Sequence, residues 1–304
     1  MRERELTRRE LLELFGSAVA LAPALACKAA PVSKDKPMSE TTTNDAARMP
    51  VIFVGHGSPM NAVLDNAWSR GFAQLGDALA HTPKAILAVS AHWYVPGTFL
   101  TGNAQPKTIH DFGGFPRELY EIQYPARGHV DLAKRVSSLL SSRAASLRED
   151  WGYDHGTWQV LRHMRPQADL PVIQLSIDHR LPPAEHVAIG RALTPLRDEG
   201  VLIVGSGNIV HNLRHAIRGL STGSTEIPPW AEAFDVHVQN ALEQHDNDYL
   251  ARALSDDTGR MAHPTPDHYY PLLYTAGAAS RDDAVSFPIV GFDSSISMRS
   301  VRWG

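Results

Sequence analysis

The stretch PVIFVG at residues 50–55 is an uninterrupted apolar run that ends on a glycine and leads directly into His56. A run of this length, rich in β-branched residues and bounded by Pro and Gly, is typical of a strand covered on both faces. Three further runs share this character, namely residues 84–90 (KAILAVS), 170–177 (LPVIQLSI) and 200–205 (GVLIVG). Together they predict a sheet of largely parallel strands at the centre of the fold.

Helical patterns lie between and after these runs. They cover approximately residues 66–79, 130–141, 157–164, 183–198, 229–254 and 266–279. Pro182 and Pro183 mark one helix start and Gly200 follows its end. Residues 286–302 alternate like edge strands. This order predicts an α/β fold, a three-layer α/β/α sandwich with a largely parallel central sheet, in one domain spanning residues 49–304.

Composition limits the classes of function. The chain has 304 residues, of which 43% are hydrophobic and 20% charged, and its net charge is −4, so nothing indicates a nucleic acid or an anionic membrane as a partner. A single cysteine, Cys27, rules out an intrachain disulfide and a thiolate metal cluster. A bound metal would therefore need His, Asp or Glu ligands, and the chain has 15 histidines.

The N-terminal segment resembles an export signal. Arg8 and Arg9 precede an uncharged stretch that ends in Ala24-Leu-Ala26, which predicts a twin-arginine signal peptide over residues 1–26, a flexible linker over 27–48 and a periplasmic protein. The apolar run is too short to span a bilayer. Acidic residues offset the arginines, so an amphipathic first helix is the alternative. Cleavage after Ala26 would expose Cys27, where lipid anchoring is a further alternative.

Four histidines follow predicted strands or begin a predicted helix. His56, His92 and His211 come after the first, second and fourth runs, and His268 falls in the first turn of the helix at 266–279. In open α/β sheets, ligands bind beyond the carboxyl ends of the strands. Imidazole is a suitable ligand for zinc and iron. Each histidine alone could be a helix cap or a core residue, but four in equivalent places favour one shared site.

Two Gly-rich aromatic loops, at residues 109–116 (IHDFGGFP) and 151–158 (WGYDHGTW), are further candidates. Long ordered loops in compact domains are usually functional. Their aromatic rings could wall a flat substrate, and His110 and His155 could hydrogen-bond it. The alternative is that these rings only cover the end of the sheet.

These motifs resemble the 4,5-DOPA extradiol dioxygenase family, within the LigB-type (class III) extradiol ring-cleavage superfamily. The resemblance runs from about residue 50 to the C-terminus and rests on six motifs in one order, at residues 55–61, 90–93, 109–116, 151–158, 205–212 and 264–273. It implies a LigB-like sandwich and a metal-dependent enzyme that inserts O2 into a catechol-type, DOPA-like aromatic diol.

The resemblance also implies His56, His92, His211 and His268 as metal-site residues. One divalent metal is expected, Fe(II) for activity or Zn(II). Extradiol sites commonly use two His and one carboxylate, whereas these motifs offer four histidines. We therefore expect His56 and His92 as the firmest ligands. Either His211 or His268 can act as the acid/base instead of as a ligand, and the wider superfamily favours His211. His155 and His110 are expected as substrate hydrogen-bond donors.

Two other interpretations remain open from the sequence. A zinc-dependent hydrolase could use three histidines and a bound water. A metal-binding or storage protein of the cell envelope could also use the histidines, although it has no need of aromatic, Gly-rich loops.

Overall fold

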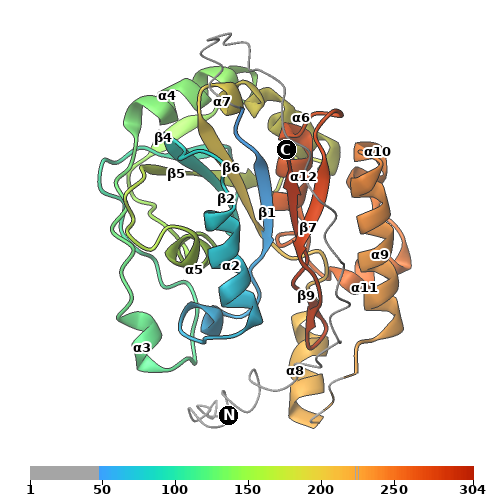
Figure 1. The fold of residues 1–304 in the computed structure, drawn as a ribbon. Coiled ribbons are helices and arrows are strands. Elements are labelled where there is room, and N and C mark those ends of the chain that lie inside the picture. The colour runs from blue at the N-terminus through green and yellow to red at the C-terminus, as the bar shows by residue number, and fades with distance from the viewer. Residues whose placement is uncertain (1–47, 223, 225) are drawn as a thin grey trace, which may run out of the picture.

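The computed structural model describes residues 48–222, 224 and 226–304. Its main sheet has eight strands in the order β4-β3-β5-β2-β6-β1-β10-β7 (Figure 1). The four central strands run parallel, which confirms the predicted sheet: β5 (Val172–Asp178), β2 (Ala85–Val95), β6 (Val201–Gly207) and β1 (Val51–Gly55).

On both sides of these four strands, the sheet continues with a strand that runs antiparallel to them. On one side β3 (Phe99–Thr101) pairs with β5 and carries β4 (Ser146–Arg148). On the other, β10 (Ser300–Trp303) pairs with β1 and with β7 (Val285–Ile289). Between β7 and β10, a separate two-stranded hairpin is formed by β8 (Phe292–Asp293) and β9 (Ile296–Ser297). The alternating segment at 286–302 thus forms strands, as predicted.

Helices cover both faces of the sheet because alternate residues of each central strand point in opposite directions. In β1, Ile52 and Val54 pack in a core with α2 (Ala67–Asp77) and α5 (His155–Met164). Val51 and Phe53 pack on the opposite side, in a core shared with α6 (Pro183–Leu193), α9 (Pro229–Glu243) and α12 (Tyr270–Ala278). The predicted three-layer sandwich is therefore confirmed.

Further helices connect these elements. They are η1 (Pro59–Ala62), α3 (Arg117–Tyr120), α4 (Val130–Leu139), η2 (Ser141–Arg143), α7 (Pro195–Asp198), α8 (Leu213–Thr222), α10 (Asn247–Arg252) and α11 (Asp257–Ala262). The helix predicted at 229–254 is in fact two, because α9 ends at Glu243 and His245 adopts a left-handed backbone with φ 51°. The helix predicted at 183–198 is likewise two helices, which are separated at Thr194. Pro195 begins α7 and has no backbone N–H to continue the hydrogen bonds of α6.

Strand β2 continues past the predicted end at Ser90 and carries His92 within it. Its pairing with β5 passes from Val89–Leu175 directly to Tyr94–Ile177, so β2 has extra residues at this point. Such a bulge changes the direction in which side chains leave a strand. The prediction that His92 follows the strand was wrong in detail, since it lies in this bulge.

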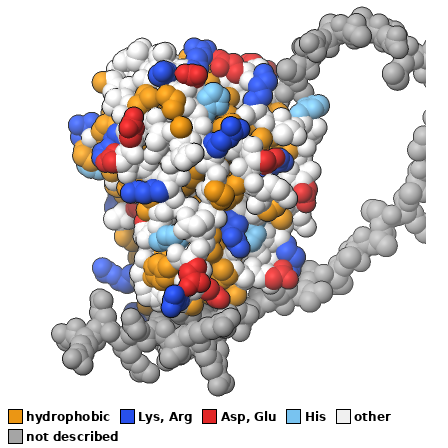
Figure 2. Space-filling model, turned by 90° about the vertical axis from the view of Figure 1, so that its left-hand side faces the viewer, with side chains coloured by type: hydrophobic (Ala, Val, Ile, Leu, Met, Phe, Trp, Pro, Cys, Tyr) orange, Lys and Arg blue, Asp and Glu red, His pale blue; other side chains and the backbone are white. Residues whose placement is uncertain are grey.

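The predicted signal peptide (1–26) and linker (27–48) lie outside the described residues, apart from Arg48. Among the described residues, no helix is both long and apolar enough to cross a membrane. On the face shown in Figure 2, acidic and basic side chains are interspersed with hydrophobic ones, in keeping with a net charge of −4.

Candidate metal centre

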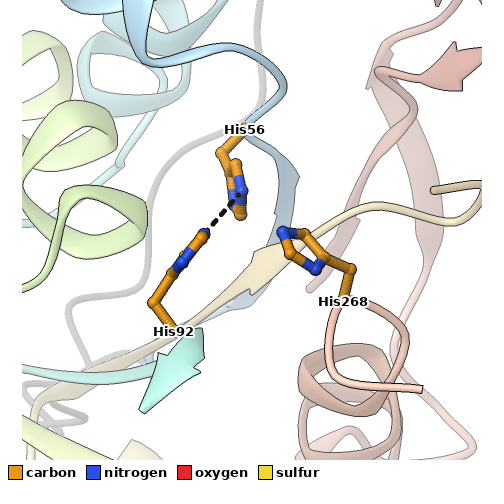
Figure 3. A group of neighbouring side chains, drawn as sticks. All are labelled: His56, His92 and His268. Atoms are coloured by element: carbon orange, nitrogen blue, oxygen red, sulfur yellow. Dashed lines mark hydrogen bonds between the residues drawn. The ribbon is translucent and has the colours of Figure 1, made fainter. Parts of the chain in front are cut away.

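Three histidines from separate elements converge beyond the carboxyl ends of the central strands. His56 directly follows β1, His92 lies in the bulge of β2, and His268 lies in the turn before α12 (Figure 3). Their ligand nitrogens all lie within 4.8 Å of one another, and the Nε2 atoms of His56 and His92 are 3.3 Å apart. His268 was predicted in the first turn of the helix, but α12 begins at Tyr270, so the turn before it carries this ring.

The hydrogen bonds of Ser206 determine which nitrogen of His56 is free. The Ser206 hydroxyl donates its hydrogen to the carbonyl oxygen of Gly156, at 2.6 Å. It can therefore only accept from His56 Nδ1, at 2.9 Å. The neutral ring then carries its hydrogen on Nδ1 and leaves the lone pair of Nε2 free to bind a metal ion.

The other two histidines have carboxylate partners at the same atom. Nδ1 of His92 lies 3.0 Å from Oδ2 of Asp111, and Nδ1 of His268 lies 2.5 Å from Oδ2 of Asp267. A carboxylate bonded to Nδ1 orients the ring and makes Nε2 a stronger ligand. All three rings thus have an oxygen at Nδ1 and an available Nε2.

Electrostatics favour neutral rings at two of the three positions. Burial, followed by the charges of neighbouring histidines, lowers the pKa of His56 and His268 well below the usual value. Burial acts in the same direction on His92, but the hydrogen bond to Asp111 and the charges of Asp154 and Asp111 outweigh it and raise that pKa. A positive charge on the His92 ring, whether from a proton or a metal ion, is therefore stabilised.

These residues fit a divalent metal ion. Imidazole nitrogens bound to one zinc or iron ion, at about 2.0–2.1 Å from it, are roughly 3 Å apart, close to the His56–His92 separation. Neutral imidazole suits both metals. A second group, His92, Asp111 and His155, also meets the distance criteria for a metal site. Because Asp111 Oδ2 lies 3.0 Å from Nδ1 of both rings, this group is better explained as hydrogen-bonded support for His92.

A cavity of about 260 Å³ opens beside the three histidines. Phe112 and Phe115 form part of its wall, as do Leu213 and Ile217 of α8. The aromatic loop at 109–116 therefore contributes to the cavity, as one of the two interpretations of the sequence predicted. An apolar cavity with a few convergent polar groups is typical of a small-molecule site.

Comparison with known proteins agrees with this geometry. The model of the family "Catalytic LigB subunit of aromatic ring-opening dioxygenase" matches residues 48–296. The chain belongs to the LigB family. Its relatives include the 4,5-DOPA dioxygenase extradiol of Escherichia coli K12, which is 45% identical over 90% of this chain and 99% of that protein.

This LigB-family protein is also similar to a plant protein and to a solved structure. The 4,5-DOPA dioxygenase extradiol of Beta vulgaris is 38% identical over 76% of this chain and 87% of that protein. The crystal structure of an uncharacterized Escherichia coli K12 protein superimposes with a TM-score of 0.74 and 41% identity, covering 84% of this chain and all of that one.

The structure places the remaining predicted site residues of the LigB-family chain around this cavity or beside it. His211 lines the cavity and stacks on His268, with ring centroids 3.5 Å apart. Burial, then the charge of His263, lowers its pKa to about 3. It lies outside the three-histidine group, so its role as ligand or acid/base stays a prediction.

His155 also lines the cavity, but its bonding differs from the predicted role. Its Nδ1 lies 3.0 Å from Oδ2 of Asp111, whose Oδ1 accepts the backbone N–H of His155 at 2.8 Å. Burial lowers its pKa to about 4, against the pull of Asp111. The neutral ring therefore has an acceptor at Nε2, where the sequence analysis expected a hydrogen-bond donor.

His110 is not among the residues that line the cavity. Its Nε2 lies 3.0 Å from the carbonyl oxygen of Ile122, and its ring contacts Phe112 edge-on at 5.9 Å. The structure thus places it behind a wall residue. Contact with substrate stays a prediction for His110.

Three partners of the histidines, Asp111, Asp267 and Ser206, were not predicted from the sequence. Each lies within or beside one of the motifs quoted above, and Asp111 and Asp267 directly adjoin histidines in the chain. A search for carboxylates within these motifs could have found the two aspartates. The pairing of Asp111 with His92 and His155 depends on folding, because these residues come from separate segments.

Proposed function

We propose that this chain is an extradiol dioxygenase that opens the ring of a catechol with a DOPA-like side chain, using one Fe(II) ion held by His56, His92 and His268. The observation that carries the proposal is the shared pattern of the three rings. Each has an oxygen at Nδ1 and an available Nε2, at the edge of an apolar cavity. The curated relatives named 4,5-DOPA dioxygenase extradiol support the substrate class.

Ferrous iron, when bound, supplies the one-electron chemistry that links a catechol to O2, which zinc cannot supply because it has no redox chemistry. The protein contributes the cavity, in which Phe112 and Phe115 can contact the flat ring and exclude water. Apolar surroundings also strengthen the polar interactions made within the cavity.

The chain's own residues can move the protons. His155 is bonded to Asp111 at Nδ1 and accepts at Nε2, so it can take a proton from a catechol hydroxyl while Asp111 stabilises the resulting imidazolium. Within the described residues, the His211 side chain makes no hydrogen bond and stays free to exchange a proton with substrate. An anionic catechol beside either ring raises its low pKa, because opposite charge favours the protonated form.

O2 consumption tests this proposal. The purified protein is reconstituted anaerobically with Fe(II) or Zn(II) and given L-DOPA, catechol or protocatechuate. We expect uptake and a yellow ring-opened product with Fe(II) only. His56→Ala should abolish both, whereas His237→Ala, an exposed histidine of α9, should leave them unchanged. Tight metal binding with no uptake for any catechol, and ester hydrolysis with zinc instead, would replace the proposal with the hydrolase.

We also propose that the chain is exported through the twin-arginine route to the periplasm. The support is the sequence alone: Arg8-Arg9, the uncharged stretch and the Ala24-Leu-Ala26 site. A tagged chain should be found in the periplasmic fraction in shortened form. The Arg8→Lys, Arg9→Lys double variant should remain in the cytoplasm at full length, and equal export of both would refute the route.

A further inference from the structure

One carboxylate in the cavity wall has no partner among the described residues. Asp293, at the end of β8, lines the same cavity as the three histidines. Among the described residues, its carboxylate makes no hydrogen bond and no ion pair. Burial alone raises its pKa to about 6. A largely buried carboxylate normally has a cationic or hydrogen-bonding partner, because burying the charge unpaired is costly.

The hairpin that carries Asp293 is firmly held in place. Ser297 of β9 donates its backbone N–H to the carbonyl oxygen of Val210, the residue before His211, at 3.1 Å, and its hydroxyl to Asp235 at 2.6 Å. Asp235 also pairs with Arg299 in a buried salt bridge at 2.6 Å. The hairpin is therefore fixed both to the loop of His211 and to α9, and Asp293 is not an incidental feature of a loose loop.

The turn of this hairpin faces α8. Ser294 adopts a left-handed backbone with φ 58°, which is uncommon for a residue other than glycine. A Cβ atom built on Gly219 of α8 would lie 3.4 Å from the Ser294 hydroxyl oxygen. Figure 1 shows the hairpin reaching down beside α8. The hairpin and α8 lie against each other and together line part of the cavity.

The charged and titratable side chains that line the cavity are aspartates and histidines. Among the residues that the structure describes, its lining contains no lysine and no arginine. Its other charged or titratable groups are Asp111, already bonded to two histidines, and the histidines themselves, His56, His92, His155, His211 and His268. Arg214 and Arg260 line an adjoining cavity that shares His211 and His268. Within the apolar cavity, Asp293 is thus the carboxylate available for a ligand.

From these observations we propose that Asp293 determines substrate specificity by binding a cationic ammonium group on the side chain of the catechol. This inference rests on the proposed function for one point, that the substrate is a catechol. The preference for a cationic side chain does not depend on the proposed function. The aromatic ring of the substrate lies near the histidines, and its ammonium group forms an ion pair with Asp293. A charge-assisted hydrogen bond of this kind is strong when both groups are desolvated.

Three catechols that carry a cationic, a neutral or an anionic side chain on the same ring position test the proposal: 2-(3,4-dihydroxyphenyl)ethylamine, neutral 4-ethylcatechol and anionic 3-(3,4-dihydroxyphenyl)propionate. For the Fe(II) protein we expect kcat/KM to favour the amine over the neutral compound by roughly tenfold to a hundredfold. Asp293→Asn should lower kcat/KM for the amine towards that of 4-ethylcatechol, mainly through KM, and improve the anion. The control Asp282→Asn, an exposed residue, should keep the wild-type order.

Binding to the Zn(II) protein, measured by calorimetry, separates this inference from the proposed function. A preference for the amine that depends on Asp293 supports the inference even where no O2 is consumed. Equal losses for all three catechols in Asp293→Asn, or an unchanged preference for the amine, would overturn it. Thermal unfolding checks the fold of the variant, and Asp293→Lys, which should favour the anion, provides a second variant.

Discussion

The two sides of the cavity are built in contrasting ways. On the side of the histidines, each ring nitrogen that faces away from the centre has a partner, and the rings are buried on or beside core strands. On the side of α8 and the β8–β9 hairpin, Leu213 and Ile217 are 54% and 57% exposed, and Asp293 has no partner within the described part of the chain. The first side is complete without a substrate, whereas the second is completed only by a ligand. Metal binding and substrate selection are thereby separated in the fold.

Breaking the histidine side should have the largest effect. His92→Ala or His268→Ala removes one of three imidazoles, and we expect O2 uptake to fall by at least about a thousandfold because a bound metal contributes several kcal/mol to the reaction. Metal analysis of the purified variants should show a matching loss of stoichiometry. A variant with full metal content and full activity would show that the substituted histidine is not a metal ligand.

Asp111→Asn should have the next largest effect. The amide cannot act as the charged acceptor for two Nδ1–H groups, so His92 becomes a weaker ligand and His155 is less well oriented. We expect metal affinity or activity to fall by about tenfold to a hundredfold. Titration with Fe(II) under anaerobic conditions measures the metal affinity, and O2 uptake measures the activity. Asp282→Asn is the control, and an unchanged affinity with unchanged kcat would contradict the supporting role of Asp111.

The α8 side should respond in substrate binding and hardly at all in stability. Ile217→Ser removes apolar surface that a catechol side chain can cover, and we expect KM to rise up to about tenfold. Because Ile217 is already exposed, the free energy of unfolding should change by less than about 0.5 kcal/mol. Chemical denaturation and steady-state kinetics measure the two quantities. A large loss of stability with constant KM would show that α8 is structural only.

The smallest expected effect is a dependence of stability on pH at Asp293. Its pKa is raised to about 6 in the folded protein, above the ordinary value of 3.8, so ionisation is unfavourable to folding. The penalty is absent below the unfolded pKa, grows between about pH 4 and 6 and is fully present above that. Asp293→Asn should therefore raise the melting temperature at pH 7.5 and hardly at pH 4.5. A lower melting temperature at pH 7.5 would indicate a structural role for the carboxylate.

The quality of the predictions also differs between the two sides. The four central strands, and the places of His56 and His211 after two of them, could be predicted because buried parallel strands have continuous apolar runs, which are visible in the sequence. The β8–β9 hairpin has two residues in each strand and no such run. Its position depends on Ser297, Asp235 and Arg299, whose contacts join residues more than sixty positions apart.

The sequence by itself determined the three-layer sandwich and the family, because periodicity and ordered motifs are local properties of the chain. It also determined which histidines are candidates for the metal centre. Only the tertiary structure decided that His268 joins His56 and His92 while His211 stacks on it, and that oxygens of Ser206, Asp111 and Asp267 bond their Nδ1 atoms. The direction of a ring and the partner of a carboxylate depend on bulges, turns and packing between distant segments. The pattern of residues along one strand or helix does not contain this information.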